Sequence, residues 1–240
     1  MTLTPCVLKF KMIYMKNILV LLLAGEGLRL YSAIKVKKQF YQINGTEMFV
    51  FPLKQAIQSQ VFSKIILVTN SEDIPLVKQM LFKNGLPSFD IIAGGNSRNE
   101  SVQKALMVLK SEADDFRIFI HDADRVLITS DFFISLEKEC QDAEALTPVI
   151  PLQDSILKKT DSGINYLDRK DLFLVQTPQV FDYRKLLEIY ENGYDQNDTD
   201  DFKKAVVQGL KCKTVIGDAL NFKVTSMSDL KILKAIMGDK

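Results

Sequence analysis

Short runs of apolar residues alternate along the chain with longer stretches in which apolar and polar positions follow a helical spacing. The runs are rich in Ile, Leu and Val and too short for helices, so they are typical of buried strands. We predict strands at 18–24, 65–69, 89–93, 117–121 and 145–150. The intervening and later stretches predict helices at 48–59, 72–84, 99–110, 131–141, 183–192, 199–209 and 227–237.

Strands separated by helices indicate βαβ units, which form parallel sheets that bind ligands at the carboxyl ends of their strands. The sequence therefore predicts an α/β fold, with a Rossmann-like, mostly parallel sheet flanked by helices. No linker or repeat divides the chain, so we expect a single domain over residues 16–240. The polar segment at about 152–175 predicts a small β-arm that protrudes from the sheet.

Lysines before the apolar run at 18–24 give the amino-terminal segment some likeness to a secretory signal. The run is at the minimum length for a signal and too short to span a bilayer, and it continues directly into a glycine loop. We therefore expect a buried strand and a cytoplasmic protein. Residues 1–15 are expected to be a loose extension, with Met12 or Met15 as candidate start residues.

Composition narrows the class of protein. Apolar residues make up 47% and charged residues 25%, which is ordinary for a globular protein. A formal net charge of +1 provides no global field for nucleic acid or an anionic membrane, and we expect neither as a partner. Cys6, Cys140 and Cys212 are widely spaced, so they indicate neither a zinc site nor a disulfide framework.

A glycine loop follows the first predicted strand. Gly25 and Gly27 let the backbone approach a ligand closely, and backbone N–H groups there can bind phosphate oxygens. Arg29, Lys37 and Lys38 supply positive charge nearby. Such turns are common after strands, but the cluster of cations favours a nucleotide-phosphate site over a plain turn.

The loop differs from the two best-known phosphate loops. A dinucleotide-binding loop needs a third glycine where Leu30 stands, and the chain has no Gly-Lys-Ser/Thr sequence of the P-loop type. We therefore expect phosphate to bind here in another way.

Two further polar segments follow predicted strands. Gly94-Gly95 leads into a helix, and this turn is either a ligand site or only the start of that helix. His121-Asp122 ends a central strand, where a buried carboxylate requires a cation. Asp122 is a candidate ligand for a metal or a substrate hydroxyl, and the alternative is a structural ion pair with Arg125.

Late in the chain, an acidic cluster at 198–201 is most simply a helix amino terminus, where negative charge is favourable. Lys223 lies between apolar residues in a strand-like context. Such a lysine usually protects an edge strand from aggregation, unless it contacts phosphate.

Taken together and in order, these segments resemble the 2-C-methyl-D-erythritol 4-phosphate cytidylyltransferase family over about residues 17–235. The motifs that carry the resemblance are Ala24-Gly25-x-Gly27-x-Arg29, Lys38-Gln39-Phe40, Gly94-Gly95-x-x-Arg98-x-x-Ser101-Val102, His121-Asp122-Ala123-x-Arg125, Asp154-Ser155-Ile156, Asp168-Arg169, Gln176-Thr177-Pro178-Gln179-x-Phe181, Thr199-Asp200 and Asn221-x-Lys223-Val224-Thr225.

The resemblance implies the fold of the nucleotide-diphospho-sugar transferases and a reaction between CTP and a polyol phosphate. It implies that the loop 25–29 and Lys38 hold the triphosphate, with Mg²⁺ bridging its oxygens. The residues that it places at the nucleotide are Ala24, Gly25, Gly27, Gly95, Asn96, Arg98 and Ser101. Among them, Arg98 would support the loop that contains Gly95 and Asn96. Arg29, Lys38 and Lys223 are the implied catalytic cations.

The resemblance also implies how the second substrate binds. The implied polyol-phosphate residues are Asp122, Arg125, Ser155, Arg169, Thr177 and Thr199. Ser155 and Arg169 lie on the predicted arm and would reach the substrate of a neighbouring subunit, which implies a homodimer. Asp122 remains the candidate metal ligand, although the phosphates of CTP would hold most of the magnesium shell.

Several positions depart from the family pattern. Lys37 stands where a proline is usual, and we expect the loop to lose rigidity and gain charge. Asp124 and Val126 interrupt the usual His-Asp-Ala-Ala-Arg-Pro or His-Asp-Ser-Val-Arg-Pro, and Asp124 adds negative charge near the expected sugar phosphate. Ser155 replaces threonine, and Leu23 replaces an alanine, which is expected to narrow the pyrimidine pocket.

These departures leave the substrate open between 2-C-methyl-D-erythritol 4-phosphate and ribitol 5-phosphate. A different class of function is a catalytically weak, nucleotide-binding module. Because Lys38 and Lys223 are both retained, we expect an active enzyme.

Overall fold

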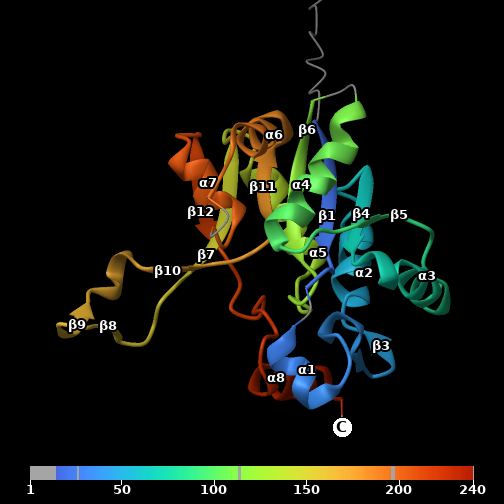
Figure 1. Ribbon diagram of the computed structural model, residues 1–240, viewed down its shortest axis with the longest axis horizontal. Coiled ribbons are helices and arrows are strands. Elements are labelled where there is room, and N and C mark those ends of the chain that lie inside the picture. The colour runs from blue at the N-terminus through green and yellow to red at the C-terminus, as the bar shows by residue number, and fades with distance from the viewer. Residues whose placement is uncertain (1–14, 26, 113–114, 196–197, 240) are drawn as a thin grey trace, which may run out of the picture.

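The computed structural model describes residues 15–25, 27–112, 115–195 and 198–239. The expected loose extension at 1–15, with Met12, lies outside the described residues except for Met15. A twisted sheet forms the centre of the molecule, with helices on both of its faces (Figure 1).

Four parallel strands form the half of the sheet that carries the site. β1 (Lys16–Leu22) pairs with β6 (Phe116–Asp122) on one side and with β4 (Lys64–Thr69) on the other. β5 (Asp90–Ala93) extends the sheet beyond β4. The register places Leu22 beside Asp122 and Val68, so the carboxyl ends of the strands lie at one edge.

The other half of the sheet is mixed. β11 (Gln179–Asp182) lies antiparallel between β6 and β7 (Ala145–Pro151). β10 (Phe173–Val175) is antiparallel to β7, and β12 (Cys212–Ile216) is parallel to it. The described residues thus form an eight-stranded sheet, in which β10, β11 and β12 were not predicted.

Alternate side chains of β1 enter the two halves of the core, as the pleat of a strand requires. Ile18 and Val20 pack towards α4 (Arg98–Val108), α6 (Tyr183–Asn192) and α7 (Asp201–Val207). Leu19 and Leu21 pack on the opposite face, which is covered by α2 (Val50–Ser59), α3 (Ile74–Lys83) and α5 (Ser130–Glu139).

The predicted helices agree with the observed ones to within a few residues. Short 3₁₀ turns, η2 (Ser71–Asp73) and η3 (Leu109–Ser111), adjoin α3 and α4. Within the described ranges, no helix has both the length and the apolar character needed to cross a membrane.

A smaller layer closes the ligand-binding edge of the sheet. It contains α1 (Leu28–Ile34), η1 (Lys38–Phe40), the hairpin of β2 (Gln42–Ile43) and β3 (Thr46–Glu47), and α8 (Met227–Met237). Leu30, Ile43, Val224 and Leu230 share one apolar cluster there. Figure 1 shows α1 and α8 side by side, so an early helix and the last helix of the chain lie in the same layer.

A β-arm leaves the body of the molecule, as predicted. β8 (Ile156–Thr160) and β9 (Gly163–Leu167) form an antiparallel hairpin, followed by η4 (Arg169–Asp171). Figure 1 shows this hairpin far from the sheet. Its residues are almost all exposed, because the arm has no core of its own.

Candidate active site

A pocket of about 920 Å³ opens where the parallel strands end. This is the edge at which α/β sheets bind ligands. Its walls come from the loops after β1, β4, β5 and β6, from η1 and from the segment before α8. The lining residues are Leu22, Leu23, Ala24, Gly25, Gly27, Lys38, Gln39, Asn70, Ser71, Glu72, Gly94, Gly95, Asn96, Ser97, Arg98, Ser101, Asp122, Ala123, Asp124, Lys223 and Thr225.

The first glycine loop shapes the path of Lys38. Gly27 has a φ of +59°, in the left-handed region that glycine adopts at little cost. A Cβ on Gly27 would lie 3.0–3.3 Å from three methylene carbons of Lys38, so the lysine stem packs on the glycine. The Lys38 ammonium donates to the carbonyl of Val224 over 3.1 Å. Arg29 belongs to α1, but its side chain lies outside the described part of the chain.

The second glycine turn is packed against the first. A Cβ on Gly94 would come within 2.8 Å of the Ser101 hydroxyl and 2.9 Å of the Cβ of Ala24. The Ser101 hydroxyl accepts from the backbone N–H of Gly95 and donates to the Ser97 carbonyl. The turn is therefore rigid, and it presents its backbone to the pocket.

The position of Arg98 differs from the expectation that it supports this turn. Its guanidinium extends across the pocket floor, where Nη1 donates to Asp201 over 2.6 Å and Nε to Asp122 over 3.4 Å. The turn is held instead by Ser97, which caps α4, by Ser101, and by the Glu100 carboxylate, which accepts from the N–H of Asn96.

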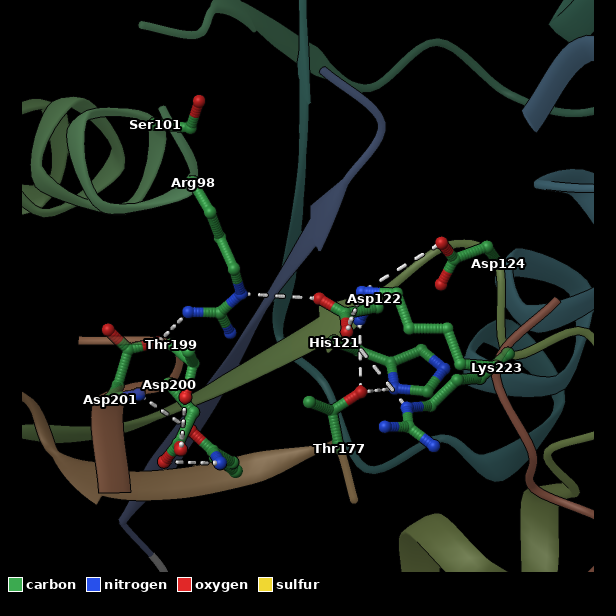
Figure 2. A network of polar contacts seen from close by, with 12 residues as sticks. Arg98, Ser101, His121, Asp122, Asp124, Thr177, Thr199, Asp200, Asp201 and Lys223 are labelled. Atoms are coloured by element: carbon green, nitrogen blue, oxygen red, sulfur yellow. Dashed lines mark hydrogen bonds and ion pairs between the residues drawn. The ribbon is translucent and has the colours of Figure 1, made fainter. Parts of the chain in front are cut away.

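Asp122 lies among three cations at the end of β6. Lys223 is 2.9 Å away, Arg98 is 3.4 Å away and Arg125 is 4.0 Å away. Burial alone would raise the pKa of Asp122, but the three cations outweigh it and hold this pKa far below its usual range. Figure 2 shows Asp122 between Arg98 and Lys223. The carboxylate is therefore ionised, and it orients the cations that surround it.

These contacts do not fit Asp122 as a metal ligand. Both of its oxygens face cationic nitrogen atoms, which a metal ion would have to displace. Among the described residues, no group of three or more His, Cys, Asp and Glu side chains is placed to hold a metal. The protein therefore offers no metal cage of its own in the part of the chain that the structure describes.

Thr177 and Arg125 lie behind Asp122 rather than in the pocket wall. The Thr177 hydroxyl accepts from the backbone N–H of Asp122 over 3.1 Å and lies 3.0 Å from Nδ1 of His121. Arg125 donates to the carbonyl of Asn221 over 2.8 Å. Both side chains are buried, and they fix the end of β6 and the segment that carries Lys223.

Three further predicted substrate residues, in addition to Arg125 and Thr177, do not line this pocket. Thr199 is exposed just before α7. Ser155 and Arg169 are exposed on the arm, away from the pocket of their own chain. Lys223 itself lies in irregular structure over residues 221–225, not in the strand-like context that its neighbours suggest.

The comparisons with known proteins agree with this geometry. A model of the 2-C-methyl-D-erythritol 4-phosphate cytidylyltransferase family (IspD) matches residues 17–239. The chain belongs to this family. It is accordingly a cytidylyltransferase, a kind of nucleotidyltransferase, as its motifs predict.

Relatives that carry the family's name cover nearly the whole chain. One, from Thermotoga neapolitana, is 31% identical over 220 residues, which are 92% of this chain and 96% of the relative. Another, from Clostridium botulinum (strain Okra / Type B1), is 30% identical over 228 residues, 92% of this chain and 97% of the relative.

Solved structures share the fold. The 4-diphosphocytidyl-2C-methyl-D-erythritol synthase of Anaerococcus prevotii gives a TM-score of 0.80 at 21% identity, over 93% of this chain and 96% of that one. The bifunctional IspDF of Campylobacter jejuni gives a TM-score of 0.75 at 29% identity, over 90% of this chain. The match covers 53% of that protein, so the chain spans about half of its length.

The departures of this cytidylyltransferase from the family pattern have local explanations. Lys37 has a φ of −59°, close to the value that proline imposes, and its ammonium pairs with Glu72 and Asp73. Its charge is thus largely neutralised and the loop is held. Leu23 lies at the pocket, and its buried side chain belongs to the apolar core cluster that contains Phe49.

Asp124 is the departure with the largest effect on the pocket. It is buried, and its carboxylate forms an ion pair with Lys38 and lies 3.9 Å from the Lys223 ammonium. Val126, the other change in this motif, packs in the apolar cluster with Leu30 and Val224.

Gln39 and Asp201 both support the cytidylyltransferase site, although neither was given a role there from the sequence. Gln39 is buried and donates to the carbonyl of Leu23 over 2.6 Å, which joins η1 to the end of β1. Asp201 is the partner of Arg98 and also accepts from Tyr190. Gln39 stood in a quoted motif, whereas Asp201 was assigned only to a helix terminus.

Proposed function

We propose that the chain transfers the cytidylyl group of CTP to 2-C-methyl-D-erythritol 4-phosphate, with release of pyrophosphate, as a step in isoprenoid precursor synthesis. The observation that carries this proposal is the convergence of Lys38, Arg98 and Lys223 on one pocket with two glycine turns. The relatives named above carry the activity in their names.

In this proposal the nucleotide spans the two glycine turns. Backbone groups of Ala24, Gly95 and Asn96, with Ser101, contact the cytosine edge, because fixed donors and acceptors distinguish bases best. The triphosphate lies over the loop that begins at Gly25, with Lys38 as its countercharge. Arg29 belongs to the same set of proposed cations.

The reaction requires two polyanions to approach one another. A phosphate oxygen of the polyol phosphate attacks the α-phosphorus of CTP, the bond from that phosphorus to the bridging oxygen breaks, and pyrophosphate leaves with the electron pair. Such transfers are catalysed mostly by positioning and electrostatic stabilisation. Lys38 and Lys223 stabilise the charge in the transition state, and the anionic nucleophile needs no general base.

Two charged features support this mechanism. Burial lowers the pKa of Lys223, but attraction to Asp122 and Asp124 outweighs this and raises it, so the ammonium stays charged. Asp122 in turn pairs with both Lys223 and Arg98 and fixes their positions on the pocket floor. Arg125 and Thr177 keep Asp122 in place from behind.

Magnesium and the second subunit are also parts of this proposal. We propose that Mg²⁺ arrives on the triphosphate oxygens of CTP, because the described side chains form no cage for it. We propose a homodimer in which Ser155 and Arg169 of one arm reach the polyol phosphate in the partner. The exposed apolar side chains of the hairpin, which such a partner would cover, are Leu157, Ile164, Tyr166 and Leu167. A cytoplasmic location is proposed as well.

The test is pyrophosphate release from CTP with a panel of polyol phosphates. We expect 2-C-methyl-D-erythritol 4-phosphate to give the highest kcat/KM. Higher activity with ribitol 5-phosphate would support the second candidate, which the departure at Asp124 leaves open because it alters the charge beside the expected substrate. UTP and ATP replace CTP in parallel reactions, and equal use of ATP would contradict cytidylyl transfer.

A thermal shift with CTP separates an enzyme from a module that only binds. A ligand of the native state raises the unfolding midpoint. A shift without turnover of any polyol phosphate would leave the nucleotide-binding module as the function.

A further inference from the structure

Asp124 lies against the two lysines that face the pocket. Its Oδ2 atom forms an ion pair with Lys38 and lies 3.9 Å from the Lys223 ammonium. The side chain is only 9% exposed. Its other oxygen, Oδ1, is buried and has no hydrogen-bond partner among the described residues. The carboxylate is therefore directed at the cations, not at a neutral donor.

Each lysine has a contact other than Asp124 that holds it in place. The Lys38 stem packs on Gly27, and its ammonium donates to the carbonyl of Val224 over 3.1 Å. Lys223 has its own carboxylate partner, Asp122, at 2.9 Å. The contribution that is particular to Asp124 is therefore its negative charge.

This charge competes with a bound phosphate. Asp122 pairs with Lys223, Arg98 and Arg125. Among the described residues, the carboxylate that pairs with Lys38 is that of Asp124. A phosphate that contacts Lys38 must separate this pair or bring its own charge next to the carboxylate. Either event weakens binding, because buried charges are poorly screened.

We propose that Asp124 is a competing counter-ion, which occupies Lys38 in the ligand-free pocket and lowers the affinity of the pocket for phosphate anions. This inference rests on the proposed function, because it takes Lys38 as a phosphate-binding residue. Its consequence for the reaction is weaker retention of pyrophosphate, the product that would contact Lys38 and the glycine loop.

The test uses Asp124→Asn, which keeps the size of the side chain and removes its charge. Calorimetry measures the Kd of pyrophosphate and of CTP for the wild type and the variant. We expect both ligands to bind about tenfold more tightly to Asp124→Asn, because the substitution removes one nearby like charge from an anion site. Inhibition by added pyrophosphate should strengthen to a similar degree.

Glu72→Gln is the matched control. Glu72 also lines the pocket, but it pairs with Lys37 and is mostly exposed, so its removal should change Kd by less than about twofold. Equal tightening in both variants would assign the effect to the general field of the pocket and overturn the proposal. Unchanged or weaker binding to Asp124→Asn would overturn it as well.

A second background tests the contact itself. In Lys38→Met, the addition of Asp124→Asn should tighten pyrophosphate binding by less than it does in the wild type, and persistence of the full effect would contradict a role through Lys38. Asp124→Ser repeats the measurement if the Asn variant does not fold, and unfolding of both would mean that the charge is structural. If the wild-type protein bound neither CTP nor pyrophosphate, the proposed function itself would be wrong. If the wild type bound CTP normally but Asp124→Asn bound these ligands no more tightly, only this inference would be wrong.

Discussion

Single side chains in this pocket act through charges that burial makes strong. Lys38 is nearly enclosed, and the partners that the structure gives it are Asp124 and one backbone carbonyl. A phosphate that reaches it meets a cation with little surrounding water. In such a place one preorganised cation contributes more than it would on the surface.

We expect Lys38→Ala to lower kcat/KM by about a hundredfold or more, because the transition-state charge loses its countercharge. Lys37→Ala is the matched control, since its ammonium is bound to Glu72 and Asp73. It should retain most of the activity. The measurement is steady-state pyrophosphate release, with circular dichroism to show that both variants are folded. Near-normal turnover by Lys38→Ala would remove this lysine from the mechanism.

His121, the one histidine of the sequence, makes stability depend on pH. Complete burial lowers the pKa of His121 to about 3, so the folded protein holds it neutral. The unfolded chain takes up a proton below about pH 6.5, whereas the folded one does not until near pH 3. The stabilisation is therefore fully present above pH 6.5 and is lost as the pH falls between these values.

Urea unfolding at a series of pH values checks this. From pH 6 to pH 5 we expect the free energy of unfolding to fall by about 1 kcal/mol more in the wild type than in His121→Gln. Parallel curves for the two proteins would show that His121 is protonated in the folded state as well.

Among the helices, α8 has the clearest influence on the pocket. The Asp229 carboxylate accepts from both the N–H and the hydroxyl of Thr225 and from the N–H of Ser226. Ser226 caps the helix by accepting from the N–H of Asp229. This capping box fixes the backbone just after Lys223, so helix geometry sets the position of a proposed catalytic ammonium.

Asp229→Ala should destabilise the protein by about 1 kcal/mol, the usual loss for a broken cap, and should also lower kcat. Ser226→Ala is the control, because it weakens the cap to a similar extent but leaves both bonds to Thr225. Chemical unfolding and kinetics together make the comparison. Equal losses of kcat in the two variants would show that only the helix, not the Lys223 segment, depends on Asp229.

The elements could be predicted where one physical signal dominates. The continuous apolar runs of β1 and β4 are unmistakable, and so is the pattern of α8. By contrast, α1 has seven residues and no side-chain cap, and β11 has four residues, so neither carries enough pattern. The pocket cations could be identified by residue type, but their partners could not. Asp201 is 103 positions from Arg98, and only the fold brings them together.

At the scale of the whole molecule, the arm is the feature that the single chain leaves unexplained. A two-stranded hairpin without a covering layer is marginally stable in water, yet this one exposes several large apolar side chains. The proposed homodimer would cover them and complete two active sites.

Mixing two impaired variants tests this arrangement. Arg169→Ala should raise KM for the polyol phosphate far more than for CTP, because a charge-assisted bond to its phosphate is lost. When Arg169→Ala and Lys38→Ala are mixed, part of the activity should return, since one of the two sites in a mixed dimer holds both residues. Co-purification of the untagged variant with the other, affinity-tagged variant shows whether subunits have exchanged. Subunit exchange without any recovery of activity would show that Arg169 does not act in the active site of the partner.

The bond from Lys38 to the carbonyl of Val224 joins positions 186 residues apart. On the ribosome, which adds about 5–20 residues per second, about 10–40 s pass between the synthesis of these two positions. Throughout that interval the glycine loop exists without Lys223 and without α8 to close it. Nascent chains therefore cannot retain a nucleotide with both lysines, and the pocket forms only when the last segment of the domain docks.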